Sequence, residues 1–207
     1  MKVILCLTLA LCFTYSQVFP SETQGLKFRG GPKTICKAYF ICESGFHLNL
    51  KSKPDFEDEN HVTIYDDFLL PLDLGYMRNI SKYIAVGASG HLSFDGNFTR
   101  YGLRPRIQYW LKTNLAVNIS PGLYWFSNES YKQVSPGKIL GLSVVFAEII
   151  ALDFIYDSYK LNSKIVEDLN LNREGYYLGI SGRSESAVIV PVIALGFAAF
   201  LQGLNNN

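Results

Sequence analysis

The stretch NLAVNISPGLYWF, residues 114–126, alternates between apolar and polar side chains along its first half. Leu115, Val117 and Ile119 occupy one set of positions, whereas Asn118 and Ser120 belong to the other. A period of two indicates a β-strand with two different faces. If water surrounds the protein, the apolar face points into a core. If lipid surrounds it, the apolar face points outward and the polar face fills the interior.

Similar stretches follow one another along the chain, with almost no helical periodicity between them. Short alternating strands separated by turn signals are typical of an antiparallel all-β fold. We expect about eight strands, forming an up-and-down transmembrane β-barrel. The expected strands are Thr34–Leu48, Asp67–Arg78, Tyr83–Phe94, Arg100–Leu111, Asn114–Phe126, Lys138–Glu148, Ile150–Tyr159 and Glu174–Arg183.

The connections between these strands alternate in length. The second, fourth and sixth are tight, around 79–82, 112–113 and 149. The first, fifth and seventh are long and polar, at 49–66, 127–137 and 160–173, and the third, at 95–99, is intermediate. In an up-and-down barrel this alternation places turns at one rim and loops at the other, as outer-membrane barrels do.

The two faces of the expected strands differ in composition. One face carries large aliphatic and aromatic side chains, and we expect it, with Leu115, Val117 and Ile119, to face lipid. The other face mixes small residues, which suit the crowded interior of a narrow barrel, with charges that must pair when buried: Asp73, Arg104, Arg106, Asp153, Asp157 and Arg183. Glu148 is an exception, because it falls on the apolar side at the end of its strand.

Aromatic residues near strand ends are expected to form the girdles that mark the membrane–water interfaces. The expected girdle residues are Tyr76, Tyr83, Tyr101, Tyr109, Tyr124, Trp125 and Tyr156.

The N-terminus has the form of a secretory signal, with Lys2, an apolar run over residues 3–13 and small residues before Gln17. We expect cleavage near Ser16 and the organisation 1–16 signal peptide, 17–33 N-terminal segment, 34–183 barrel and 184–207 hydrophobic tail. A formal charge of +1 provides no electrostatic basis for nucleic-acid binding.

The C-terminal tail holds a run of apolar residues at 187–201, which is slightly short for a helix that spans a membrane. We expect a short helix capped by Ser184 or Ser186, with a further strand as the alternative.

Three stretches carry a resemblance to a known family: LDLGYMRNISKYIAVGASGHL at 72–92, GLRPRIQYWLKTNLAVNISPGLYW at 102–125 and GYYLGISGR at 175–183. Together with the Ser16-Gln17 site, they resemble the small eight-stranded outer-membrane β-barrel proteins of Bacteroidetes-type bacteria, which are OmpA/OmpX-like. The resemblance implies a bacterial outer-membrane location, with membrane lipid and the barrel-insertion machinery as partners. The chain departs from the family because it continues past the last expected strand, where many such barrels end on an aromatic residue.

No motif in the chain predicts a catalytic, cofactor or metal site. His91 with Ser89 or Ser93 is the combination that a lipid-modifying enzyme would use, but its expected register points His91 inward, which favours a hydrogen-bonded interior histidine. His47 and His61 belong to no motif, and no nucleophile elbow is present. The acidic run of Asp55, Glu57, Asp58 and Glu59 lacks the spacing of a calcium loop and is interpreted as a solvated loop.

Cys36 and Cys42 are interpreted as small hydrophobic residues. Both lie in one expected strand, where six residues span roughly 20 Å, too far for a disulfide. They also lack the second pair of ligands that a structural zinc site needs.

Three functional hypotheses follow. The first is a non-enzymatic outer-membrane barrel with a structural or surface-interaction role, whose unknown extracellular ligand would contact the loops after Leu48, Phe126 and Tyr159. Its interior should hold a plug of paired charges, because eight strands leave a lumen just filled by side chains. The second is a secreted, soluble, lipocalin-like barrel with a small apolar ligand, suggested by sequons at Asn79, Asn97, Asn118 and Asn128. It requires the opposite polarity of the faces. The third is an outer-membrane lipid-modifying enzyme.

Overall fold

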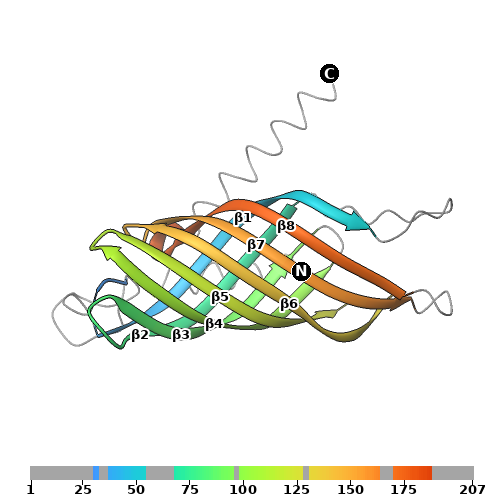
Figure 1. Cartoon of the computed structure of the whole chain (residues 1–207), viewed down its shortest axis with the longest axis horizontal. Helices are drawn as coiled ribbons and strands as arrows, with labels where there is room; N and C mark the ends of the chain where they lie inside the picture. Colours follow the sequence, from blue (N-terminus) through green and yellow to red (C-terminus); the bar gives the residue numbers. More distant parts are fainter. Residues whose placement is uncertain are drawn as a thin grey trace, which may run out of the picture.

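The chain folds as a closed antiparallel β-barrel of eight strands in a computed structural model that describes residues 30–32, 37–54, 68–95, 98–127, 131–163 and 170–187 (Figure 1). The strands are β1 (Ala38–Pro54), β2 (Phe68–Asn79), β3 (Ile84–Phe94), β4 (Thr99–Lys112), β5 (Leu115–Ser127), β6 (Tyr131–Phe146), β7 (Ile150–Ser163) and β8 (Asn170–Arg183). Each pairs with its neighbours in sequence, so the topology is up-and-down, and the expected all-β antiparallel barrel of eight strands is confirmed.

The barrel closes through pairing of β1 with β8, from Glu43↔Arg183 to Pro54↔Arg173. This ladder explains why β1 extends to Pro54, beyond the expected end at Leu48. Residues 49–54 lack a clear apolar alternation, but β8 supplies backbone partners across a register shift between Asn49 and Lys51. Among the described strands, this pairing removes the two long edges that an open sheet would expose.

The connection between β5 and β6 is shorter than the sequence predicts. β6 begins at Tyr131, whereas the strand was expected to begin at Lys138. Register shifts between Gln133 and Ser135 and between Ser135 and Lys138, around Pro136, interrupt the period of two. The stretch therefore resembles a polar loop although its backbone continues the ladder with β7.

The tight turn between β6 and β7 moves Glu148 to the inside of the barrel, in contrast to the expected position on the apolar face. β6 ends at Phe146, and residues 147–149 form the turn. Ala147 and Glu148 have φ values of 53° and 55°, in the left-handed region. The change of direction there breaks the alternation, and the Glu148 side chain is buried.

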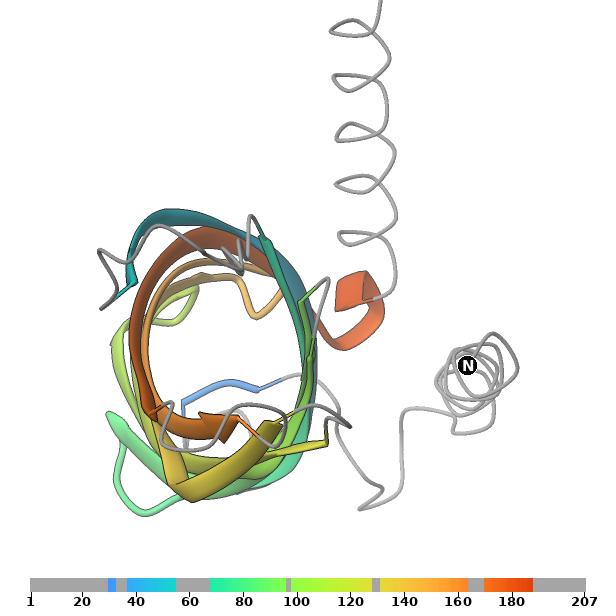
Figure 2. The ribbon, with the colours of Figure 1, turned by 90° about the vertical axis from the view of Figure 1, so that its right-hand side faces the viewer.

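The two faces of the wall have the polarity expected for a lipid-facing barrel. On β4, Tyr101, Leu103, Ile107, Tyr109 and Leu111 are exposed on the outside, whereas Arg104, Arg106, Gln108 and Trp110 are buried inside. On β5, Ile119 faces outward and Ala116, Asn118 and Ser120 face inward. The end-on view of Figure 2 shows the eight strands closed into a ring.

The short 3-10 helix η1 (Ser184–Ala187) follows β8 and lies over the outside of the β1–β8 seam. The hydroxyl of Ser44 donates to the carbonyl of Ala187, and the hydroxyl of Ser186 donates to the carbonyl of Ile149. Cys42 and Ser44 point outward by register and are nevertheless buried at this seam. In the part of the chain that the structure describes, no helix is long and apolar enough to cross a membrane.

Several sequence predictions fall outside the described residues. They are the signal peptide, Cys36, His61, the acidic run at 55–59, the sequons at Asn97 and Asn128, and the tail beyond Ala187.

Inward-facing glycines allow the strands to approach closely. A Cβ atom on Gly102 would lie 2.2 Å from the Leu123 carbonyl oxygen and 2.8 Å from the Tyr124 Cα, both in the backbone of the neighbouring strand. Gly90 faces outward, and a Cβ there would meet only the Leu74 carbonyl oxygen, at 3.7 Å. The small residues on the polar face therefore meet a steric requirement of the narrow barrel.

We expect Gly102→Ala to lower the free energy of unfolding by about 1–3 kcal/mol, because neighbouring backbone cannot yield to the added methyl group. Gly90→Ala is the matched control, and it should stay within about 1 kcal/mol of the parent protein. Urea unfolding followed by tryptophan fluorescence measures both. Equal stability of the two variants would contradict the steric explanation.

Candidate functional site

The interior of the barrel holds a network of charged side chains centred on Asp73, which is 2% exposed. Its carboxylate accepts hydrogen bonds from Ser89 Oγ at 3.1 Å and Arg104 Nη1 at 2.9 Å, and it lies 3.1 Å from His91 Nδ1. Arg106 Nη2 forms an ion pair with it at 3.1 Å. These groups come from β2, β3 and β4, so one carboxylate joins three consecutive strands.

A second cluster is centred on Glu43 of β1, which lies directly across from Asp73 in the β1–β2 ladder. The Glu43 carboxylate accepts hydrogen bonds from Arg106 Nη1 at 2.7 Å and from Ser181 Oγ at 3.2 Å. The carboxylate also lies 3.0 Å from Arg183 Nη2. Arg183 also lies 3.4 Å from a carboxylate oxygen of Glu148. Arg106 therefore bridges the two clusters, because it contacts both Asp73 and Glu43.

His47 and Asp153 form a further buried pair, with Nε2 and Oδ2 3.2 Å apart. Both side chains are nearly inaccessible, so each limits the desolvation cost of the other. Among the described residues, the buried interior groups include six carboxylates, five guanidinium groups and two histidines: Glu43, Asp73, Asp95, Glu148, Asp153 and Asp157; Arg100, Arg104, Arg106, Arg173 and Arg183; His47 and His91. The opposing charges nearly balance.

The loop end of the interior is closed by an aromatic cluster around Arg100. The guanidinium carbon lies 5.7 Å from the Tyr124 ring centroid, 5.7 Å from that of Phe126 and 5.4 Å from that of Tyr159. Arg100 also pairs with Asp157 and Asp95. Cation–π contacts and ion pairs thus hold the rings across the lumen. The apolar cluster continues through Leu69, Phe98, Ile139, Ile155 and Tyr177.

The turn end is closed by a second apolar cluster, which contains Tyr39, Trp110 and Met77. The Trp110 Nε1 donates to Asn79 Oδ1 at 3.2 Å, and Asn79 Nδ2 donates to the Gly31 carbonyl at 2.7 Å. Residues 30–32, blue in Figure 2, lie within the outline of the barrel at this end. Packed apolar side chains thus flank the charged middle of the interior at both ends.

The outer surface carries aromatic pairs near both rims. Tyr83 and Tyr109 lie near the turns, with ring centroids 6.3 Å apart, and Tyr101 stacks on Trp125 nearer the loops at 6.4 Å. Tyr76 is also exposed on the outside. Tyr124 does not belong to this girdle, contrary to the sequence prediction. Successive side chains on a strand point to opposite faces, so Tyr124 points inward while its neighbour Trp125 points outward. The Tyr124 side chain is 1% exposed.

The structure places the predicted interior charges Asp73, Arg104, Arg106, Asp153, Asp157 and Arg183 inside the barrel, as expected. The sequence pattern did not identify Glu43, His47 and Arg100 as members of the network. Arg100 could have been recognised from the sequence, because it lies on the same face of its strand as Gly102 and Arg104. The face pattern of β1, which would identify Glu43 and His47, is less regular because η1 covers part of the outer side.

His91 is an interior histidine bonded to Asp73, as its register predicted. Ser89 shares the same carboxylate, and the Ser93 hydroxyl has no hydrogen-bond partner among the described residues. Within those same residues, no three His, Cys, Asp or Glu side chains gather in a way that could hold a metal ion.

No protein-family model matches the chain, and no curated protein matches it. The solved structures to which it is similar include the following three. A de novo designed transmembrane β-barrel is 10% identical, covering 70% of this chain and 93% of that chain, with a TM-score of 0.39. The outer membrane protein Ail of Yersinia pestis is 13% identical, covering 74% and 99%, with a TM-score of 0.38. The outer membrane protein OprG of Pseudomonas aeruginosa is 13% identical, covering 78% and 99%, with a TM-score of 0.33. The strand pairing itself shows the closed eight-stranded barrel.

We expect Asp73→Asn to lower the free energy of unfolding by about 3–5 kcal/mol. The substitution preserves shape but leaves Arg104 and Arg106 with less compensating charge in a buried site. Ser93→Ala is the matched control on β3. It removes a buried hydroxyl that bonds to no described atom, so its effect should stay below about 1 kcal/mol. Urea unfolding measures both. A small effect of Asp73→Asn would show that the network contributes little to stability.

Proposed function

We propose that this protein is an integral, non-enzymatic β-barrel of a bacterial outer membrane. The observation that carries the proposal is the polarity of its wall. Charged groups such as Asp73 and Arg106 are buried inside a closed barrel, while large apolar side chains such as Leu103, Ile107 and Leu152 are about half exposed outside. A surface of this kind is unfavourable in water and favourable in hydrocarbon.

The closed sheet supports the same proposal because it satisfies the backbone without water. In hydrocarbon every unpaired N–H or C=O group is costly, so only helices and closed barrels span a membrane. The pairing of β1 with β8 removes the two edges that an open sheet would expose. The tyrosines and tryptophan near the rims are the residues that membrane interfaces favour.

The packed interior supports a scaffold role rather than transport or catalysis. Apolar clusters close both ends around a charged centre, which leaves the residues outside the wall as the means of interaction with other molecules. We infer that the barrel presents the connections β1–β2, β5–β6 and β7–β8 at one rim, where a surface ligand would contact them. Topology places these connections and β3–β4 at the same rim.

A lipocalin-like function is not supported by the structure. Such a barrel needs an apolar interior cavity and a polar exterior, which is the reverse of the observed faces. The sequon at Asn118 is also buried in the interior, with 1% exposure, and Asn79 is 4% exposed.

The lipid-modifying hypothesis relies on His91, and the geometry gives it little support. A general base must reach its substrate, whereas the His91 side chain is buried beside Asp73. If His91 has only a structural role, His91→Gln should leave the composition of membrane lipids in producing cells unchanged.

The first test is heat modifiability of protein extracted from the membrane fraction. We expect the unboiled protein to migrate differently from the boiled protein on a cold detergent gel, because a closed, hydrogen-bonded barrel resists unfolding by detergent alone. Recovery of the chain in the soluble fraction, with identical mobility of both samples, would overturn the proposed function.

A second test measures how the loss of stability caused by a charge on the outer face of β4 depends on the depth of that charge in the bilayer. Ile107 lies between Tyr101 and Tyr109 along the strand, whereas Leu111 lies beyond Tyr109 near the turn; both are about half exposed. In a bilayer we expect Ile107→Arg to cost about 2–4 kcal/mol and Leu111→Arg about 0–1 kcal/mol. Urea unfolding from vesicles measures the difference. In a water-soluble barrel both substitutions would be nearly neutral.

A further inference from the structure

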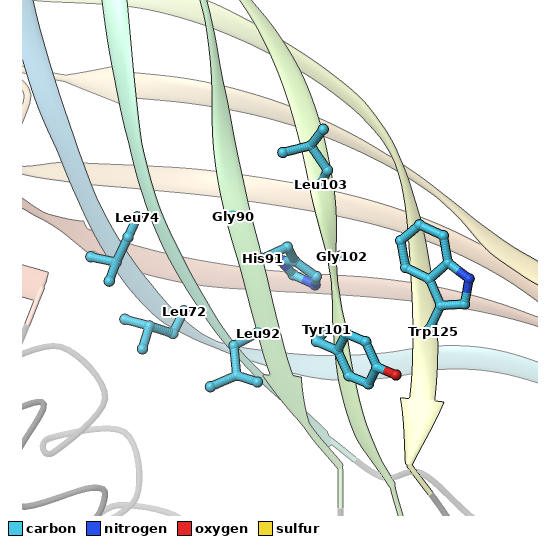
Figure 3. A pocket seen from close by; sticks show the side chains of 9 residues that line it. All are labelled: Leu72, Leu74, Gly90, His91, Leu92, Tyr101, Gly102, Leu103 and Trp125. Carbon is cyan, nitrogen blue, oxygen red and sulfur yellow. The ribbon is translucent and has the colours of Figure 1, made fainter.

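The outer wall of the barrel contains an open apolar groove over β2 to β5 with a volume of about 520 Å³ (Figure 3). Its walls are formed by Leu72, Leu74 and Leu92 on one side and by Leu103, Tyr101 and Trp125 on the other. None of these lining side chains is charged. His91 also borders the groove, but its Nδ1 lies 3.1 Å from the Asp73 carboxylate on the inner side of the wall.

The groove exists because one side chain is absent from the outer face. Strand register places Gly90 directly between Leu74 on β2 and Leu103 on β4. Neighbouring outward positions in the next row, Leu72, Leu92 and Tyr101, carry large side chains. The space above Gly90 is open, since a Cβ there would find only the Leu74 carbonyl oxygen within 4 Å. Gly90 is therefore the floor of a gap between rows of larger residues.

The position of the groove restricts what can fill it. It lies on the apolar outer face, and the stacked pair of Tyr101 and Trp125 borders it on the side of the loops. In a bilayer this depth holds hydrocarbon, and water would find no hydrogen-bond partners among the leucine side chains. A flexible hydrocarbon chain can follow an irregular gap of this kind and restore the dispersion contacts that an empty groove lacks.

We propose that this groove binds one acyl chain of a membrane phospholipid, which makes it a lipid-binding site in the outer wall. The proposal rests on the proposed function, since the groove must face a bilayer. Gly90 is its specificity-determining residue, because any larger side chain would occupy the site.

The experiment uses the mature protein folded into dimyristoylphosphatidylcholine vesicles that contain a small fraction of phosphatidylcholine with a diazirine in the middle of one acyl chain. After irradiation, adducts are mapped by peptide mass spectrometry. We expect adducts at Leu72, Leu74, Leu92 and Leu103 to exceed those at Leu140 and Leu142 on β6 several-fold. Gly90→Leu should lower them to the level of β6. Val144→Leu, which enlarges an outward residue of β6 away from the groove, should leave them unchanged.

The heat-induced mobility shift verifies that each variant is folded, and Gly90→Val provides a second, smaller filling residue. Uniform labelling around a heat-modifiable barrel, or enrichment that persists in both Gly90 variants, would overturn the groove as a lipid site and leave the proposed function intact. Failure of the parent protein to insert or to show the mobility shift would instead overturn the proposed function itself.

Discussion

The backbone ladder between β1 and β8 is the constraint on which the rest of the structure depends. Without it, the sheet would present two long unpaired edges, each a row of unsatisfied hydrogen-bonding groups. With it, the eight strands enclose a narrow interior and divide every strand into an inner and an outer face. The η1 helix lies over the outside of this seam, where the outward residues Cys42 and Ser44 are small enough to accommodate it.

Closure with only eight strands makes the interior small, and two features follow from that. Inward glycines appear where a side chain would collide with a neighbouring strand, as Gly102 does with the Leu123 carbonyl. Charged groups are admitted because they reach partners across the narrow lumen, as Arg106 does in contacting both Asp73 and Glu43. Removing one member of a buried ion pair is therefore expected to lower stability strongly, because the remaining charge has no access to water.

The interior and exterior then take separate roles. Apolar and aromatic clusters flank the charged centre at both ends, so the packed interior forms the core of the molecule. Under the function proposed above, the exterior provides the surfaces for interaction, which are an apolar wall for lipid, a groove above Gly90 in that wall, and the connections at the loop rim. In this arrangement the usual relation between core and surface is reversed, because the polar residues are packed and the apolar residues contact the surrounding medium.

Much of this could be predicted from the sequence because side chains on a strand alternate strictly. The alternation of Leu115, Val117 and Ile119 with Asn118 and Ser120 identified the two faces, and the charges on the glycine-rich face identified which one points inward. The same rule fails where the backbone departs from a regular strand. The left-handed turn at Ala147 and Glu148 directs the Glu148 side chain to the inside of the barrel, opposite to the face that the alternation predicts. The register shifts near Pro136 interrupt the alternation, so the start of β6 is not recognisable from the sequence.

By itself, the sequence determined the strand-rich class, the approximate number of strands and the polarity of most positions, since these depend on local periodicity. Only the tertiary structure decided which charges pair, that Tyr124 turns inward to Arg100, and that Gly90 leaves a groove between Leu74 and Leu103. These features depend on the register between strands. A shift along a neighbouring strand changes every cross-strand partner, and no local pattern in a single strand specifies that register.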